Sequence, residues 1–289
     1  MKSKIANAPA TLPPIRSDRP AHPVTPNEQL RLLCVDIARE AGDFAHRSRL
    51  VLGPGARAAH DTKSSAVDPV TEFDRATETR VFERLRAERP DDSIVGEEGS
   101  NHRGTSDLTW HIDPIDGTVN FVYDLPLWST SVGVLRHGDP VAGAIYVPVV
   151  GDMYSAASGA GAFVNDAPIS ASTVADTATS LVATGFSYHV GGERQLQADR
   201  IARMLPAVRD IRRSGSAAVD LAAVAAGRVD AYFEPHINSW DVAAGVVLVR
   251  EAGGVVTAFD GSALDVTAPK GLVAAGPGLH RAVVQLVSD

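Results

Sequence analysis

Residues 110–121 read WHIDPIDGTVNF, an apolar run that passes directly into acidic and turn-forming residues. The apolar part, residues 110–112, is typical of a short buried strand. Asp113 follows it at once, and Asp116 comes three residues later, after a proline. Both carboxylates can therefore turn toward one point where the strand ends. An isolated aspartate before glycine is usually a turn residue, so this pair needs support from elsewhere in the chain.

The chemistry of the acidic pair favours a hard metal ion. Carboxylate and carbonyl oxygens are the ligands that Mg²⁺ prefers. Two such ions that share Asp113 would hold both the attacking and the leaving oxygen of a phosphoryl transfer. Gly117 and Thr118 then open a helix or a tight turn, whose free backbone N–H groups can receive a phosphate. The stretch thus indicates a metal-dependent site for a phosphate ester.

Three further segments place carboxylates near the ends of apolar runs or at the start of a helix. They are Gly96-Glu97-Glu98-Gly99 after Ile94-Val95, Asp68-Pro69-Val70-Thr71 followed by Asp74, and Ser239-Trp240-Asp241. Each acid alone has an ordinary explanation on the surface or in a turn. The conjunction of four such segments is much harder to obtain by chance.

Residues 110–121 resemble one signature of the inositol monophosphatase family, and residues 240–245, WDVAAG, resemble the second. Residues 63–74, 96–98 and 213–218 match three further segments of the family, in the expected order. The resemblance extends from about Leu30 to the carboxyl terminus.

This resemblance implies a fold and a domain organisation. We expect an α+β layered sandwich in which α and β layers alternate, the sugar-phosphatase architecture. The phosphatase domain would cover residues 26–289 in two lobes, roughly 26–165 and 166–289, after a flexible arm at 1–25. Homodimers are usual in the family.

The resemblance also implies how two or three Mg²⁺ ions are held. Glu97, Asp113 and the backbone carbonyl of Ile115 would hold the first ion, and Asp113, Asp116 and Asp241 the second. A third, weaker position is expected near Glu97. Occupation of the second position by Li⁺ would make the enzyme lithium-sensitive.

Three side chains are implied in activating the attacking water. Thr118 and Asp74 would help to polarise it, and Glu97 would share that work. The attack would be direct and in line, without a phosphoenzyme, in agreement with the lack of an obvious activated nucleophile in the sequence. Lys63 is either a solvated loop lysine or, as at the matching position of the family, part of a loop that folds over the site.

The resemblance specifies the reaction, hydrolysis of a phosphate ester, more closely than it specifies the alcohol that carries the phosphate. Glu234 lies seven residues before Asp241, as does the family glutamate that contacts inositol hydroxyls. Gly215, Ser216 and Ala217 match positions that line the sugar pocket. A carboxylate there can accept hydrogen bonds from a polyol, and it can equally pair with the ammonium group of an amino alcohol phosphate.

We therefore expect myo-inositol 1-phosphate as the substrate, with L-histidinol phosphate as the close alternative. Fructose 1,6-bisphosphate and 3′-phosphoadenosine phosphates rank lower, because no added basic cluster is visible for a second phosphate. A different class of function is a regulatory binding protein that keeps the fold and acts through transcription-complex or RNA contacts. The complete set of carboxylates argues against a role by binding alone.

Some residues beside these motifs have a plainer interpretation. Glu98 is expected to be a surface or helix-facing acid rather than a ligand, and Trp240 to pack in the core next to the site. Arg212 and Arg213 are expected to support structure or a dimer rather than to hold phosphate. The nine histidines show no paired ligand spacing.

Composition agrees with an enzyme in the cytoplasm. Of the 289 residues, 44% are apolar and 21% charged, which suits a well-packed globular protein. No run approaches the roughly 18 apolar residues needed to cross a bilayer. Cys34 is the single cysteine, so an intrachain disulfide is excluded. The net charge of −8 argues against nucleic acid or an anionic membrane as a partner.

Residue patterns predict the individual elements. A helix begins at a capping box over residues 25–28, and a second helix runs from about Val70 to Arg89. Further helices are predicted at 193–204, from 216 to Gly227, and at 241–252. Strands are predicted at 94–95, 110–112, 129–135, 142–147, 153–156, 181–185, 208–211 and 231–233, with those between 129 and 156 antiparallel.

Overall fold

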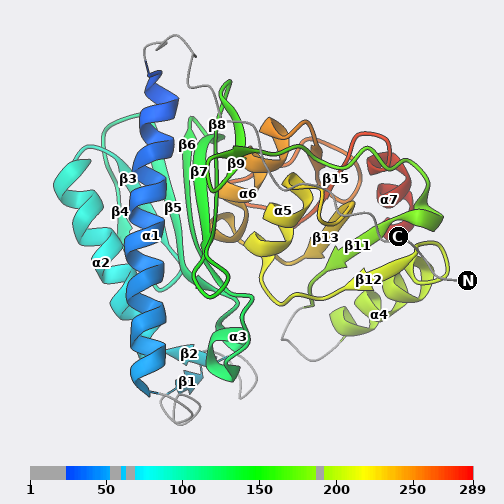
Figure 1. Ribbon diagram of the computed structural model, residues 1–289, viewed down its shortest axis with the longest axis horizontal. Helices are drawn as coiled ribbons and strands as arrows, with labels where there is room; N and C mark the ends of the chain where they lie inside the picture. The colour runs from blue at the N-terminus through cyan, green and yellow to red at the C-terminus, as the bar shows by residue number, and fades with distance from the viewer. Residues whose placement is uncertain (1–23, 53–59, 63–68, 187–191, 289) are drawn as a thin grey trace, which may run out of the picture.

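Helices and sheets alternate in layers in the computed structural model, which describes residues 24–52, 60–62, 69–186 and 192–288 (Figure 1). An eight-stranded sheet has helices α1 and α2 on its outer face and α5 and α6 on its inner face. A five-stranded sheet follows, with α4 and α7 beyond it. The alternating layers expected from the sequence are confirmed. The predicted arm up to residue 23, Lys63 and Asp68 lie outside the described residues.

The larger sheet carries the acidic segments of the middle of the chain. Its strand order is β10-β9-β8-β7-β6-β5-β3-β4, and neighbours are antiparallel except for the parallel pair β3 and β5. The antiparallel arrangement predicted for the strands between residues 129 and 156 is confirmed. The strands are β3 Ser93–Gly96, β4 Asn101–His102, β5 Leu108–Asp116, β6 Ser129–Arg136, β7 Asp139–Val147, β8 Asp152–Ala157, β9 Gly161–Val164 and β10 Ala167–Pro168.

The smaller sheet has the order β12-β11-β13-β15-β14, with β11 parallel to both β12 and β13. The pairs β13–β15 and β14–β15 are antiparallel. Its strands are β11 Leu181–Thr184, β12 Asp210–Arg212, β13 Ala231–Pro235, β14 Val255–Thr257 and β15 Gly271–Ala275. A separate antiparallel pair consists of β1 His60–Thr62 and β2 Pro69–Thr71.

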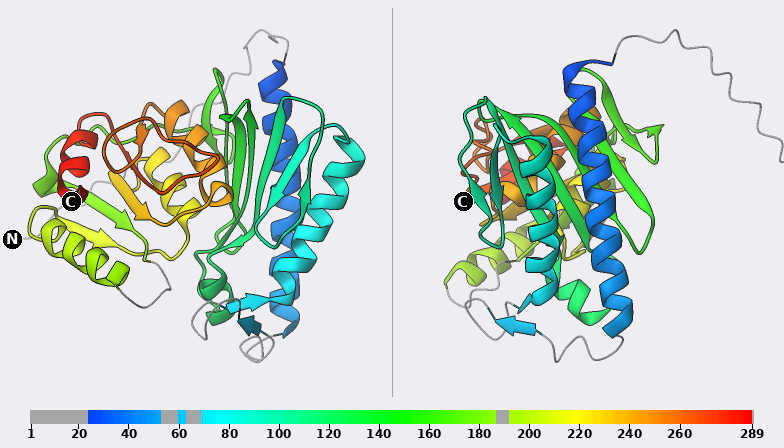
Figure 2. Two further views of the ribbon diagram at one scale, coloured as in Figure 1. Left: turned by 180° about the vertical axis from the view of Figure 1, so that it is seen from behind. Right: turned by 90° about the vertical axis from the view of Figure 1, so that its left-hand side faces the viewer.

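The helices cover both sheets, and α1 and α2 lie side by side over the larger one (Figure 2). They are α1 Pro26–Leu52, α2 Glu72–Glu88, α3 Thr118–Tyr123, α4 Gly192–Met204, α5 Ala217–Ala225, α6 Ser239–Glu251 and α7 His280–Val287, besides a short 3₁₀ turn at Thr177–Thr179. The capping box predicted for α1 is present. The Glu28 N–H donates to Thr25 Oγ1 at 3.2 Å, and the Thr25 N–H donates to Glu28 Oε2 at 3.0 Å.

The apolar cores lie between successive layers. Leu85, Trp110 and Ile112 belong to the core between the larger sheet and helices α1 and α2. A second core joins the inner face of that sheet to α5, α6 and the smaller sheet. The approach of α6 is close, because a Cβ built on Gly133 of β6 would lie 2.6 Å from the Cβ of Ala243. Small residues on both sides therefore bring the start of α6 against the larger sheet.

The structure differs from the sequence prediction at several boundaries. Helix α2 begins at Glu72 rather than Val70, because residues 69–71 pair with β1. Strand β5 continues to Asp116 instead of ending at Ile112. Strands β9, β14 and β15 and helix α7 were not predicted. Within the described residues, none of the helices has both the length and the apolar character that a bilayer crossing requires.

Candidate active site

A cavity of about 630 Å³ brings residues of both halves of the chain together. Its walls come from β5, the loop after β3, the starts of α3, α5 and α6, and the end of β13. Among its lining residues are the sequence-predicted site residues Glu97, Asp113, Ile115, Asp116, Gly117, Thr118, Gly215, Ser216, Ala217, Glu234 and Asp241. Segments more than a hundred residues apart in the sequence thus share one pocket.

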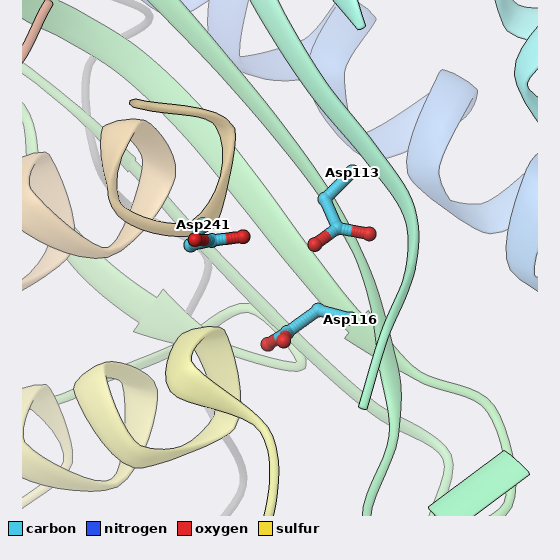
Figure 3. Close-up of side chains that lie close together, drawn as sticks. All are labelled: Asp113, Asp116 and Asp241. Carbon is cyan, nitrogen blue, oxygen red and sulfur yellow. The ribbon is translucent and has the colours of Figure 1, made fainter. Parts of the chain in front are cut away.

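Asp113 and Asp116 lie on β5 beside an irregularity in its pairing with β6. In a regular strand, residues three apart face opposite sides of the sheet. The register shifts between these two residues, within a segment where Pro114 has no N–H to give to the ladder. The two carboxylates consequently point into one space, which the carboxylate of Asp241 also enters (Figure 3).

The backbone groups around this irregularity in β5 are hydrogen-bonded. The Thr130 hydroxyl donates to the Pro114 carbonyl at 2.8 Å, and the Ile115 N–H donates to Asp113 Oδ1 at 3.1 Å. The Thr118 hydroxyl donates to the Ile115 carbonyl at 3.2 Å. Gly117 has a φ of 90°, a left-handed conformation that glycine adopts without strain, and α3 begins directly after it.

Asp116 is held at the amino-terminal end of α5. Its Oδ2 accepts hydrogen bonds from the Ser216 hydroxyl at 2.5 Å and from the Ala218 N–H at 2.6 Å. Ser216 Oγ also accepts from the Val219 N–H, so it is the N-cap of the helix. Burial raises the pKa of Asp116 to about 6, although these hydrogen bonds act in the opposite direction.

Asp241 occupies the first turn of α6, where its Oδ2 accepts the Asn238 N–H at 2.7 Å. Burial, followed by the negative charges of Asp116 and Glu97, raises the pKa of Asp241 well above its ordinary value. Two helix amino termini thus face the same acidic cluster. Their partial positive charge favours carboxylates there without neutralising them.

Glu97 joins this cluster from the loop after β3. Its N–H donates to the Ile112 carbonyl on β5 at 3.2 Å, and its carboxyl group is hydrogen-bonded to that of Asp113. Burial and the charges of Glu97, Asp116 and Asp241 raise the pKa of Asp113 well above its ordinary value. Four carboxyl groups therefore lie close together, those of Asp113 and Asp116 buried and those of Glu97 and Asp241 half-buried, and their like charges repel.

This donor set fits a metal ion. Asp113, Asp116 and Asp241 each offer an oxygen, and these oxygens all lie within 4.8 Å of one another. Two carboxyl groups in hydrogen-bond contact need a proton or a cation between them, and a hard divalent cation would offset the charge of all four carboxylates. The aspartate triad can therefore bind a metal.

Another part of the cavity lining combines two acids with an arginine. The Tyr232 hydroxyl donates to Glu234 Oε2, and burial raises the pKa of Glu234 to about 7. Asp220, four residues into α5, is buried, hydrogen-bonds Ser214, and has a pKa raised well above the ordinary value by burial. The positive charge of Arg213 lowers the pKa of both carboxyl groups, against the larger effect of burial.

Asp220 and Arg213 are among the lining residues that sequence reasoning did not assign to the site. Arg213 was expected to support structure or a dimer, and the structure places it in the cavity wall. Its neighbour Arg212 is exposed and pairs with Asp210 at 2.6 Å. A signal for Asp220 existed, since an aspartate is unusual in a helix of small apolar residues that follows a predicted site segment.

Other sequence-predicted positions lie beside the cavity or outside the described chain. Asp74 is buried in the first turn of α2, outside the set of described residues that line the cavity. Glu98 faces α2 and lies 3.8 Å from Arg75, in agreement with the helix-facing interpretation. Trp240 lines the cavity instead of packing wholly in the core. Lys63 falls outside the described residues.

Comparison with known proteins gives a consistent result. A sequence profile of the inositol monophosphatase family matches residues 27–289. The inositol-1-monophosphatase of Mycobacterium leprae is 45% identical over 246 residues, which are 79% of this chain and 83% of that protein. The Nus factor SuhB of Pasteurella multocida is 36% identical over 259 residues, 88% of this chain and 94% of its own. The solved structure of an IMPase from Thermotoga maritima has a TM-score of 0.80 at 33% identity, over 90% of this chain and 96% of that one.

Proposed function

We propose that this chain, which belongs to the inositol monophosphatase family, hydrolyses myo-inositol 1-phosphate to inositol and inorganic phosphate with the help of Mg²⁺. The chain is a phosphoric monoester hydrolase by its relationships. The observation that carries the proposal is one cavity lined by four clustered carboxyl groups, those of Glu97, Asp113, Asp116 and Asp241, together with the polar side chains of Asp220, Glu234 and Arg213.

Two or three Mg²⁺ ions are proposed for the acidic side of the cavity. Glu97, Asp113 and the Ile115 carbonyl would hold the first, and Asp113, Asp116 and Asp241 the second. The chemistry that bound Mg²⁺ supplies is neutralisation of phosphate oxygen charge and polarisation of the ester bond. These ions would also resolve the mismatch between a chain of net charge −8 and an anionic substrate.

The side chains and backbone would position the phosphate and move the proton. Backbone N–H groups at Gly117 and Thr118, which line the cavity at the start of α3, would orient the phosphate. A water molecule would attack phosphorus in line as the P–O ester bond breaks. Its proton would pass to the Glu97 carboxylate, with Thr118 and Asp74 helping to orient the water, and the inositol oxygen would leave as an alcohol after taking a proton from a solvent water molecule. The cycle would have no phosphoenzyme.

The part of the lining that contains Asp220, Glu234 and Arg213 favours a polyol over an amino alcohol. A permanent guanidinium cation at Arg213 would repel the ammonium group of L-histidinol phosphate. Glu234, with a pKa of about 7, can accept or donate a hydrogen bond near neutral pH, which suits hydroxyl groups. We therefore place myo-inositol 1-phosphate ahead of L-histidinol phosphate.

A regulatory role is the second candidate, because relatives named Nus factor SuhB match this chain over 82% to 94% of their length. The convergent acidic cluster favours catalysis over binding alone. An Asp113→Asn variant separates the two, since a cellular phenotype that survives loss of phosphatase activity would support the regulatory role. Homodimerisation, inhibition by Li⁺ and a cytoplasmic location belong to the same proposal.

The decisive experiment is phosphate release from myo-inositol 1-phosphate with Mg²⁺, repeated after addition of EDTA. We expect release that EDTA abolishes and Mg²⁺ restores, and a higher kcat/KM than for L-histidinol phosphate. A folded, Mg²⁺-supplied protein that releases phosphate from L-histidinol phosphate alone would overturn the substrate assignment. Release that persists in EDTA would overturn the role of the metal.

A further inference from the structure

The loop that carries Glu97 rests on a buried carboxylate that does not face the cavity. Glu78 belongs to α2 and is 1% exposed. Its Oε2 accepts the Glu98 N–H at 2.7 Å, and its Oε1 accepts the Ser100 N–H at 2.8 Å. Both oxygens of one carboxylate thus bind the backbone on the far side of Glu97.

The loop is fitted closely around this carboxylate. A Cβ built on Gly96 would lie 2.5 Å from Glu78 Cδ, so only glycine lets the loop approach so near. The Gly96 N–H donates to the Ser100 carbonyl at 2.8 Å and closes the turn. On its other side, the Glu97 N–H donates to Ile112 on β5. The backbone of Glu97 is therefore fixed from both α2 and β5.

Hydrogen bonds from backbone N–H groups to a carboxylate are stronger than those between neutral groups. An amide in place of the Glu78 carboxylate keeps one acceptor oxygen and turns an NH₂ group toward a backbone N–H. One of the two hydrogen bonds is then lost, and a buried N–H is left without a partner. The loop that presents Glu97 would lose its fixed position, although Glu78 touches neither the cavity nor the substrate.

We propose that Glu78 is a positioning residue which, together with Gly96, holds Glu97 in place to bind a divalent cation. The inference rests on the proposed Mg²⁺-dependent function. It predicts that Glu78 sets the affinity for Mg²⁺ and leaves recognition of the polyol unchanged, because the wall around Glu234 is built from other elements.

The test compares Glu78→Gln with Glu83→Gln, an exposed glutamate on the same helix. For Glu78→Gln we expect the Mg²⁺ concentration for half-maximal activity to rise at least about tenfold, as is typical for groups that orient metal ligands. KM for myo-inositol 1-phosphate at saturating Mg²⁺ should stay within about twofold, and Glu83→Gln should match the wild type. Circular dichroism establishes that each variant is folded.

A second readout does not depend on turnover. The rise in Tm caused by Mg²⁺, and calorimetric titration with MgCl₂ alone, should both show the same weakening in Glu78→Gln and in Gly96→Ala. If the wild type binds Mg²⁺ but releases no phosphate from the inositol ester, the proposed substrate fails while the inference on Glu78 is still tested. The inference on Glu78 would be overturned if folded Glu78→Gln had the Mg²⁺ affinity of the wild type. If Glu78→Gln does not fold, the same result in folded Gly96→Ala would overturn the inference. A loss of Tm equal with and without Mg²⁺ would show a structural role only.

Discussion

Among single residues, Asp113 stands at the centre of the acidic cluster, since burial and three neighbouring carboxyl groups raise its pKa. We predict that Asp113→Asn lowers kcat/KM more than about a hundredfold, because several kcal/mol of charge stabilisation are lost with a shared ligand. The metal-free variant should nevertheless have a higher Tm than the metal-free wild type, by about 2–4 °C for each kcal/mol of repulsion removed. Differential scanning fluorimetry of both proteins, with and without Mg²⁺, measures this difference in Tm. A lower Tm in EDTA would contradict the view that the cluster is under electrostatic strain.

The Arg213 side chain is expected to influence which of the two substrates is preferred. If its cation disfavours an ammonium group, Arg213→Gln should lower the preference for myo-inositol 1-phosphate over L-histidinol phosphate, measured as the ratio of kcat/KM values. A factor of about ten corresponds to 1.4 kcal/mol, a reasonable value for one partly screened charge. The neighbouring variant Arg212→Gln is the control, since Arg212 is exposed and pairs with Asp210. An unchanged ratio would exclude Arg213 as a selectivity determinant.

At the scale of elements, a buried side-chain pair joins the strand that carries Asp113 to the helix that carries Asp241. His111 Nδ1 on β5 lies 2.9 Å from the Ser239 hydroxyl at the start of α6. Burial lowers the pKa of His111 to about 4, so the ring is neutral at pH 7 and can share a hydrogen bond with the hydroxyl. The pair fixes two ligand-bearing elements relative to each other.

A double-mutant cycle of His111→Leu and Ser239→Ala should measure this coupling. Each single variant leaves a buried polar group without its partner, so each should cost about 1–3 kcal/mol in the free energy of unfolding. The double variant should cost less than the sum by about 1 kcal/mol. Urea unfolding in EDTA gives the values without a contribution from metal binding. Strict additivity would show that the two side chains do not stabilise each other.

The elements also show what the sequence can and cannot predict. The capping box of α1 is local chemistry between Thr25 and Glu28, and it was predictable for that reason. The continuation of β5 to Asp116 depends on pairing with β6, a contact that no local pattern encodes. Strand β15 was missed because its residues, GLVAA, are small and lack the alternation of a half-buried strand.

The candidate site also has residues that a local pattern predicts and residues that only the tertiary structure reveals. Its acids stand in motifs that can be recognised by spacing, and the structure gathers Glu97, Asp113, Asp116 and Asp241 into one cavity. Asp220 and Arg213 could not be placed in this way, since their part in the cavity follows from the direction in which α5 and the loop before it run. The catalytic role of Asp74 stays a prediction.

For the molecule as a whole, the acidic cluster links stability to pH and to metal binding. The folded-state pKa of Asp116 is raised from 3.8 to about 6, and that of Glu234 from 4.5 to about 7. Carboxyl groups with raised pKa values hold protons more tightly in the folded than in the unfolded chain. Their ionisation therefore destabilises the fold as the pH rises from about 4 to about 7. Lowering the pH from 7.5 to 5.5 should raise the Tm of the metal-free protein.

Bound Mg²⁺ reverses this dependence, because a cation needs the ionised carboxylates and competes with the protons. The gain in Tm caused by Mg²⁺ should thus be largest at pH 7.5 and shrink toward pH 5.5, which thermal unfolding at fixed Mg²⁺ concentrations can follow. His111 acts in the opposite direction: its lowered pKa gives stability that is present above about pH 6.5 and lost as the pH falls toward about 4. The wild type must therefore be compared with Asp113→Asn, in which His111 is retained and the cluster is weakened. If the metal-free Tm of both proteins changes equally between pH 7.5 and 5.5, ionisation of the acidic cluster does not set the pH dependence of stability; if the gain in Tm caused by Mg²⁺ is the same at both pH values, protons and Mg²⁺ do not compete at the cluster.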